Sequence, residues 1–198
     1  MASILQSLER TILAGFALLV AIIIVTGAVS GQFIRADFAW FTFVMRWLHV
    51  LSGVMWIGLL WYFNFVQIPT VPKIEPAEHR AAVTKFIAPK ALFWFRYGAL
   101  ATVVTGGLLA WMNGYLFQAL ALQSGHVAIG LGMWMALVMA FNVWFIIWPN
   151  QKIALGIVDG TAEEKAKAGR MAMLTSRFNT LFSIGMLYLM VAQQNAGL

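Results

Sequence analysis

The sequence contains no cysteine, and this absence excludes several kinds of chemistry. A chain without thiols forms no disulfide, thiolate metal site, iron–sulfur cluster or covalently attached c-type haem. A glycine-rich phosphate loop, a dinucleotide-binding fingerprint and an HExxH zinc motif are missing too. Any chemistry must therefore come from histidines, from a few buried amides or from a partner.

Charged residues are also scarce, at 10% of the 198 residues against 62% hydrophobic residues. This composition leaves too little polar surface for a soluble globule. The apolar stretches are long enough for helices that cross a bilayer, and they lack the alternation typical of barrel strands. The sequence predicts an all-α integral membrane bundle in contact with lipid, as a single domain over residues 1–198. We expect five transmembrane helices, at about 11–30, 38–68, 91–112, 126–149 and 172–192.

The first apolar stretch has a second interpretation. It has a short charged start, and Ala28 and Ser30 fit a signal peptidase site. Cleavage there would leave four spans. We expect the segment to remain as the first helix, which puts the two termini on opposite sides of the membrane.

Lysine and arginine gather in two connections, at residues 69–90 and 150–177. The stretch "NGYLFQALALQSG" and the tail "QQNAGL" contain neither residue. The positive-inside rule then predicts a cytoplasmic N-terminus, cytoplasmic basic connections and an outside C-terminus. This asymmetry accounts for the net charge of +6, so we expect no nucleic-acid partner.

Helix boundaries are indicated by prolines and by one capping pattern. We expect Pro69 and Pro149 to end the second and fourth spans, and Pro89 to stop a short surface helix in the first basic connection. Thr161 and Glu164 form a capping-box pattern, which predicts the start of a helix that runs into the last span.

His49 and His126 lie inside two predicted spans that run in the same direction. They precede Pro69 and Pro149 by 20 and 23 residues, or about 30 and 35 Å along a helix. Both imidazoles are therefore predicted toward the outer face, at heights that differ by about one turn. Each is followed four residues later by a glycine, Gly53 or Gly130, which leaves room for a flat ligand on the same helix face.

Two neutral imidazoles at a similar depth in the membrane suit the axial positions of haem b, so His49 and His126 are the predicted iron ligands. Arg46, three residues before His49, is placed to pair with haem propionates, or alternatively to reach water at the interface. Gly53 and Gly130 complete the predicted pocket. The alternative for both histidines is a hydrogen bond to a neighbouring helix, although ionisable groups inside membranes are usually functional.

Other embedded residues are typical of helix packing. Arg96 is expected to anchor the third span at the interface. A stripe of small residues predicts close helix contact, and four polar residues are expected to bond across helices. The stripe is Gly98, Thr102, Gly106 and Ala110, and the polar residues are Asn64, Asn142, Asn179 and Ser183.

The segments "RWLHVLSGVMWIGLLWYFNFVQIP", "FWFRYGALATVVTGG" and "NVWFIIWPNQK" resemble the membrane domain at the N-terminus of bacterial membrane-bound urate hydroxylases, from Trp47 to about Asn179. The resemblance implies a multi-pass protein of the bacterial inner membrane and a relation to oxidoreductases. Such enzymes end in a cytochrome c domain, for which this chain has no cysteine. The histidine-then-WIG pattern is also distantly similar to small haem-binding membrane proteins, including bacterial protoporphyrinogen oxidases.

Three functions follow as hypotheses. The leading one is a haem-b-binding electron-transfer protein that exchanges electrons with a separate cytochrome c near the outer face. The second is an oxidase that acts on urate or a porphyrin-like substrate in the same pocket, with one axial position open. The third is a haem-free accessory subunit of a respiratory complex, whose histidines only form hydrogen bonds.

Overall fold

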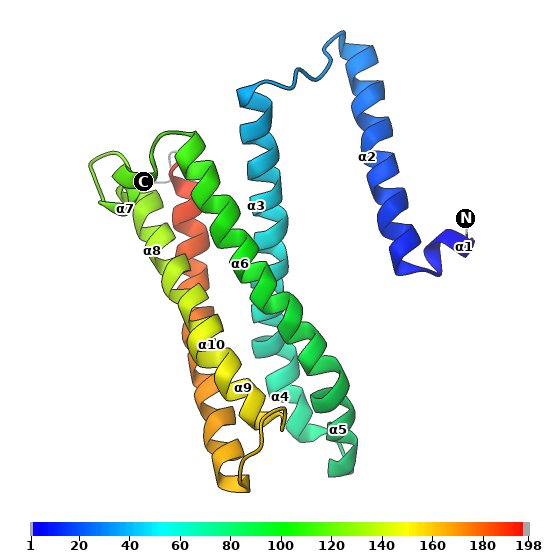
Figure 1. Cartoon of the computed structure of the whole chain (residues 1–198), viewed down its shortest axis with the longest axis vertical. Helices are drawn as coiled ribbons and strands as arrows, with labels where there is room; N and C mark the ends of the chain where they lie inside the picture. Colours follow the sequence, from blue (N-terminus) through cyan, green and yellow to red (C-terminus); the bar gives the residue numbers. More distant parts are fainter. Residues whose placement is uncertain (1, 196–198) are drawn as a thin grey trace. The chain divides into compact units, whose positions relative to one another are not determined.

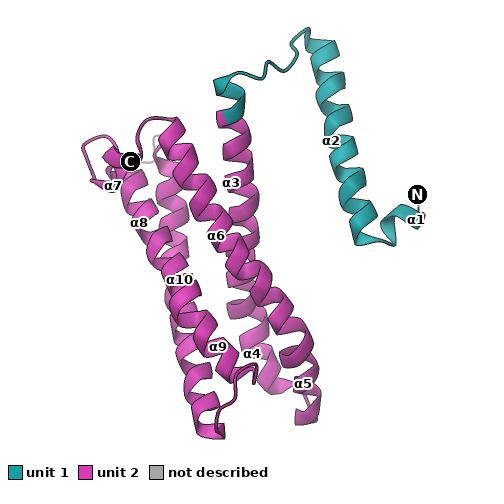
Figure 2. Ribbon diagram, viewed as in Figure 1, with its two compact units in different colours: residues 1–41 teal, residues 42–198 magenta. Residues whose placement is uncertain are grey.

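A computed structural model describes residues 2–195 of the chain (Figure 1). These residues form helices and connections without a strand, which confirms the predicted all-α class. The chain divides into two compact units, residues 1–41 and residues 42–198 (Figure 2).

Unit 1 contains α1 (Ala2–Leu5), α2 (Leu8–Ser30) and the beginning of α3 (Phe38–Trp61). The Ser7 hydroxyl accepts a hydrogen bond from the backbone N–H of Arg10 and caps α2. Gly31 ends α2 in the left-handed conformation, at φ 67°, which a side chain would disfavour. Almost the whole apolar surface of α2 is exposed, as suits contact with lipid.

Unit 2 is built from long antiparallel helices. The run that begins with α3 continues through η1 (Tyr62–Gln67), α4 (Ile68–Thr70) and η2 (Val71–Lys73). The second run comprises η3 (Ala77–His79), α5 (Arg80–Ala82), η4 (Val83–Ile87) and α6 (Ala88–Met112). After the short α7 (Leu116–Leu120), the third run comprises α8 (Val127–Phe141), η5 (Asn142–Ile147) and α9 (Trp148–Ala154), and α10 (Ala162–Ala192) completes the unit.

Four helical runs of the described chain are long and apolar enough to cross a membrane. They are Leu8–Ser30, Phe38–Lys73, Ala77–Met112 and Val127–Ala154, and they coincide with the first four predicted spans. The fifth predicted span lies within α10, which has sufficient length at 31 residues but lower hydropathy. The lower hydropathy comes from charged residues between Glu163 and Arg177, most of which are exposed, and from polar residues, of which Ser176, Asn179 and Ser183 are buried. A multi-pass membrane protein is supported, whereas the fifth span and the sidedness stay predictions.

The prolines do not end the helices, contrary to the sequence-based expectation. The π-helical segments η1, η4 and η5 end two residues before Pro69, Pro89 and Pro149, and each helix continues beyond its proline. Proline lacks an N–H and its ring collides with the carbonyl four residues earlier, so the preceding turn widens. The widened turn accommodates proline within a membrane helix. The prolines therefore do not mark the ends of these helical runs.

Polar residues of α10 connect it to the other runs, as predicted. The Asn142 side-chain amide donates to the Asn179 side-chain oxygen at 2.8 Å, and the Asn179 amide donates to the Met139 carbonyl at 2.9 Å. Asn64 donates to the Ser176 hydroxyl at 2.8 Å. Asn64 and Asn142 thus both lie in π-helical segments and both bind α10.

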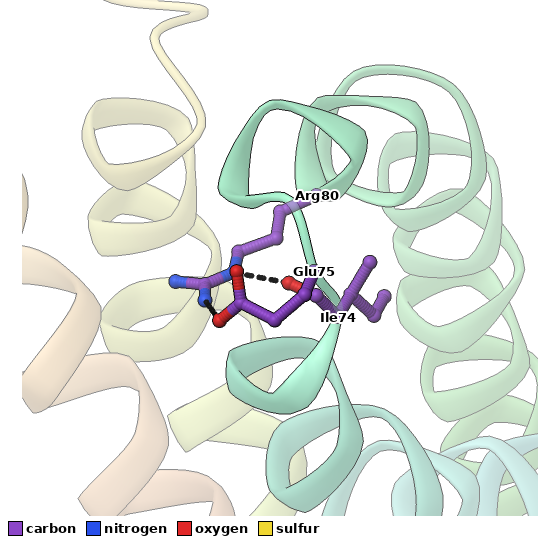
Figure 3. A network of polar contacts seen from close by, with 3 residues as sticks. All are labelled: Ile74, Glu75 and Arg80. Atoms are coloured by element: carbon purple, nitrogen blue, oxygen red, sulfur yellow. Dashed lines mark hydrogen bonds and ion pairs between the residues drawn. The ribbon is translucent and has the colours of Figure 1, made fainter.

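Two connections at one end of unit 2 have defined local structure. Arg80 forms an ion pair with Glu75 at 3.1 Å and donates through Nε to the Ile74 carbonyl, which closes the turn between the first two runs (Figure 3). The predicted capping box at Thr161 and Glu164 is confirmed at the start of α10. Its hydrogen bonds hold the pKa of Glu164 below the ordinary value.

Candidate functional site

His49 lies on the face of α3 that packs against α6. Its Nδ1 is 2.9 Å from the Thr102 carbonyl oxygen and 3.4 Å from the Thr105 hydroxyl. The Thr105 hydroxyl already donates to the Ala101 carbonyl at 2.6 Å, so the Thr102 carbonyl is the principal partner. A carbonyl oxygen only accepts hydrogen bonds, so Nδ1 carries the hydrogen and donates it.

This hydrogen bond determines which nitrogen of neutral His49 has an available lone pair. With the hydrogen on Nδ1, Nε2 is unprotonated. Within the described chain, the hydrogen-bond partners of the ring are all at Nδ1. Histidines that bind metals are commonly oriented by such a bond from the opposite nitrogen. His49 thus forms the hydrogen bond to a neighbouring helix that was the predicted alternative to ligation, and Nε2 has no hydrogen-bond partner among the described residues.

Gly106 allows the His49 ring to approach α6. A Cβ at this position would lie 2.6 Å from Cε1 and 2.9 Å from Nδ1 of His49. At Gly98, two turns earlier, a Cβ would lie 3.3 Å from the backbone nitrogen of Trp56. The predicted small-residue stripe therefore packs against α3, and it also receives the imidazole. The stripe was visible in the sequence, but its pairing with His49 was missed.

His126 caps the beginning of α8 and does not lie within that helix. Its backbone carbonyl accepts from the Gly130 N–H at 2.9 Å. The imidazole stacks on the Tyr115 ring with centroids 5.8 Å apart. Neither ring nitrogen has a hydrogen-bond partner among residues 2–195. Unlike His49, His126 is held by ring stacking and its tautomer is not fixed.

Tyr115 connects the surroundings of His126 with those of Arg46. It lies in the turn between α6 and α7. Burial raises the pKa of the Tyr115 phenol, and the positive charge of nearby Arg46 opposes that change. Arg46, one turn before His49, is exposed. Tyr115, which sequence reasoning missed, thus links Arg46 with His126, whereas the printed contacts of His49 are with α6.

The two glycines that follow the histidines face protein. At Gly53, an added Cβ would lie 3.9 Å from the Thr102 methyl carbon. At Gly130, it would collide with the Ala119 carbonyl oxygen and lie 2.8 Å from a methyl carbon of Leu122. Gly130 therefore lets α7 pack closely against α8, and the space beside it is taken by backbone.

A cavity of about 300 Å³ lies between the start of α8 and the end of α10. Gly125, Leu131 and Gln193 are among its lining residues, and Gln193 bridges the two helices by donating to the Gly125 carbonyl at 2.8 Å. Neither histidine lines this cavity. It is therefore separate from the surroundings of His49.

The side chains of the described residues do not form a complete metal site by themselves. Residues 2–195 contain no group of three or more His, Cys, Asp or Glu that could hold a metal ion. One or two histidines are, however, the usual protein contribution to haem, because the macrocycle supplies the other four nitrogen ligands. The donor set therefore fits haem better than a bare metal ion.

Comparison with known proteins supports the sequence resemblance over part of the chain. Residues 109–196 match the family model described as urate oxidase N-terminal. The matched segment includes His126 and Gly130 but neither His49 nor Arg46. No curated protein and no solved structure matches the chain. The resemblance to urate hydroxylase membrane domains is thus confirmed for that segment.

Proposed function

We propose that this protein binds haem b within the membrane and transfers electrons, with Nε2 of His49 and a ring nitrogen of His126 as the axial ligands. The observation that carries the proposal is the 2.9 Å hydrogen bond from His49 Nδ1 to the Thr102 carbonyl. This bond leaves Nε2 free, orients the ring and raises its basicity, as is usual for histidines that bind metals.

The other residues around the two histidines have separate roles in this proposal. Gly106 provides the space in which the His49 ring reaches its carbonyl partner. The exposed guanidinium of Arg46 is suited to pair with propionate carboxylates. Tyr115 positions the His126 ring by stacking. Haem, when bound, supplies an iron that alternates between ferric and ferrous states.

A cytochrome c is the proposed electron partner. The sequence has no cysteine for a covalent c-type haem of its own. Tyr115 and His126 flank the segment that contains α7, which lies at the end of unit 2 opposite the basic connections (Figure 1), and the positive-inside rule puts that end outside. A haem at this end would be placed for exchange with a soluble carrier on the outer side of a bacterial inner membrane.

The second candidate is an oxidase that acts on urate or a porphyrin-like substrate, with the iron held by His49 alone. Two observations favour it. Residues 109–196 match the urate oxidase N-terminal family. The His126 imidazole is stacked on Tyr115 and has no orienting hydrogen bond among the described residues. An open axial position would allow a substrate or oxygen to bind next to the iron.

The visible absorption spectrum of the full chain, purified in mild detergent from haem-supplemented cells, distinguishes these functions. The electron-transfer proposal predicts a Soret band and two sharp low-spin bands on reduction. A high-spin spectrum would support the oxidase instead. Absence of a Soret band would contradict both haem proposals and leave the haem-free accessory subunit.

A further inference from the structure

Arg96 is an arginine inside a long membrane helix, and its charge has no acidic partner among the described residues. It lies within the run Ala77–Met112. The ion pair between Arg80 and Glu75 is the only salt bridge in the part of the chain that the structure describes. A charge at such a position is costly unless it is paired. The sequence-based expectation of a simple interface anchor does not explain this arrangement.

The guanidinium of Arg96 is stacked on an aromatic side chain of the third run. Its Cζ lies 3.3 Å from the ring centroid of Trp148 and 5.8 Å from that of Trp144. The Lys152 ammonium lies 5.8 Å from the same Trp148 ring. Two cations therefore share one indole at the end of unit 2 that carries α9. Cation–π contacts hold these groups in place, but they do not neutralise them.

Several hydrogen-bond donors around Arg96 are buried without an acceptor in the described part of the chain. Within residues 2–195, Nε and Nη1 of Arg96 lack a partner, and so does the indole Nε1 of Trp144. Leaving buried donors unsatisfied is unfavourable, and native proteins contain few of them. Three such donors in contacting side chains, together with a second cation, indicate a place that receives negatively charged oxygen atoms.

We propose that Arg96, Trp144 and Lys152 form a binding site for a phosphate group. A guanidinium presents N–H donors in a fork that matches phosphate oxygens, and an ammonium adds a point charge. One phosphate would satisfy the unpaired donors of Arg96 and offset both charges. Trp148 would hold the guanidinium flat, so that its N–H donors point outward in a plane parallel to the indole.

Two sources of phosphate have this chemistry, the headgroup of an anionic membrane lipid and a soluble phosphate. Basic pockets between membrane helices on the cytoplasmic side commonly bind lipid headgroups. Arg96, Trp148 and Lys152 are each only partly buried, but Nε and Nη1 of Arg96 are themselves buried, so a phosphate reaches these donors from the surface of unit 2 only when neighbouring side chains move. The experiment therefore includes both sources.

The test measures the thermal unfolding midpoint of the full chain in a neutral detergent by tryptophan fluorescence. One arm titrates phosphatidylglycerol against phosphatidylcholine, and the other titrates inorganic phosphate against chloride at equal ionic strength. We expect a saturable increase of the midpoint in at least one arm. For Arg96→Gln the half-saturating concentration should rise about tenfold or more, because hydrogen bonds to a charged group are lost. Lys152→Gln should weaken binding less.

Arg177→Gln is the matched control, because Arg177 is an exposed arginine on α10. The Arg177→Gln variant should bind the titrated lipid or phosphate with the same half-saturating concentration as the unaltered protein. Arg96→Lys keeps the charge and removes the fork, so it should retain the fold and bind more weakly. A response in the lipid arm alone assigns the site to a headgroup, and a response to inorganic phosphate assigns it to a soluble ligand. No saturable response in either arm, or equal responses of Arg96→Gln and Arg177→Gln, would overturn the proposal.

Discussion

At the scale of single residues, Gly106 is as important to the proposed site as the histidine that it accommodates. We predict that Gly106→Ala will displace the His49 ring, because the added Cβ would lie 2.6 Å from Cε1. Loss of the orienting bond to Thr102 should weaken haem binding by about 10- to 100-fold. The measurement is haem content per protein at limiting haem.

Gly107→Ala is the control for this substitution, because an added Cβ at Gly107 has no neighbour within 4 Å. It should bind haem normally. Equal haem binding by the two alanine variants would show that the position of the His49 ring does not matter for the cofactor.

The sequence identified both histidines, because imidazoles are rare in apolar runs, but His126 is the N-cap of α8 and does not lie inside that helix. The residues that contact the two imidazoles could not be identified from the sequence. Whether His49 meets Thr102 and Gly106 depends on the register between α3 and α6, which no local pattern encodes. The same applies to Gly130, whose predicted ligand space is occupied by the Ala119 carbonyl because α7 folds back onto α8.

At the scale of elements, the buried amides of α10 are expected to stabilise the bundle. We predict that Asn179→Ala will destabilise the protein by about 1–2 kcal/mol, because it leaves the Asn142 amide and the Met139 carbonyl without this partner. The measurement is the unfolding free energy in detergent with a titrated denaturant.

Asn150→Ala provides the comparison, since the Asn150 amide donates at 2.8 Å only to the Ile146 carbonyl of its own helical run. Asn150→Ala should lower the free energy of unfolding clearly less than Asn179→Ala does. If both variants lose the same stability, the interhelical bond has no special contribution.

The helices themselves were largely predictable, and their ends were not. Apolar length located the first four spans, and the Thr161 capping box located the start of α10. The prediction that prolines end the helices was wrong, because a π-helical turn before Pro69, Pro89 and Pro149 lets each helix continue. The low hydropathy of α10 has two causes, exposed charged residues such as Arg177 and polar residues that are buried in the bundle, such as Asn179.

At the scale of the whole molecule, the distribution of basic residues predicts the sidedness. The absence of cysteine allows single cysteines to be introduced at Lys167 and Gln194 without background. These positions lie near opposite ends of α10. We predict that a membrane-impermeant maleimide will label Gln194→Cys in intact cells, and will label Lys167→Cys only after the membrane is opened.

The control is a second outside position, Gln123→Cys, in the connection between α7 and α8. It should react like Gln194→Cys, because Gln193 donates a hydrogen bond to the neighbouring Gly125 carbonyl. Labelling of Lys167→Cys in intact cells would contradict the predicted orientation.

The central claim is that His49 and His126 ligate the same iron, and the most direct test is the haem spectrum and haem content of three variants. If both histidines are axial ligands, His49→Ala and His126→Ala should each lose the low-spin bands, and the double variant should add little beyond haem loss. If the histidines only bind neighbouring groups, the spectrum should not change and their effects on stability should add. An unchanged low-spin spectrum in either single variant would contradict the bis-histidine account.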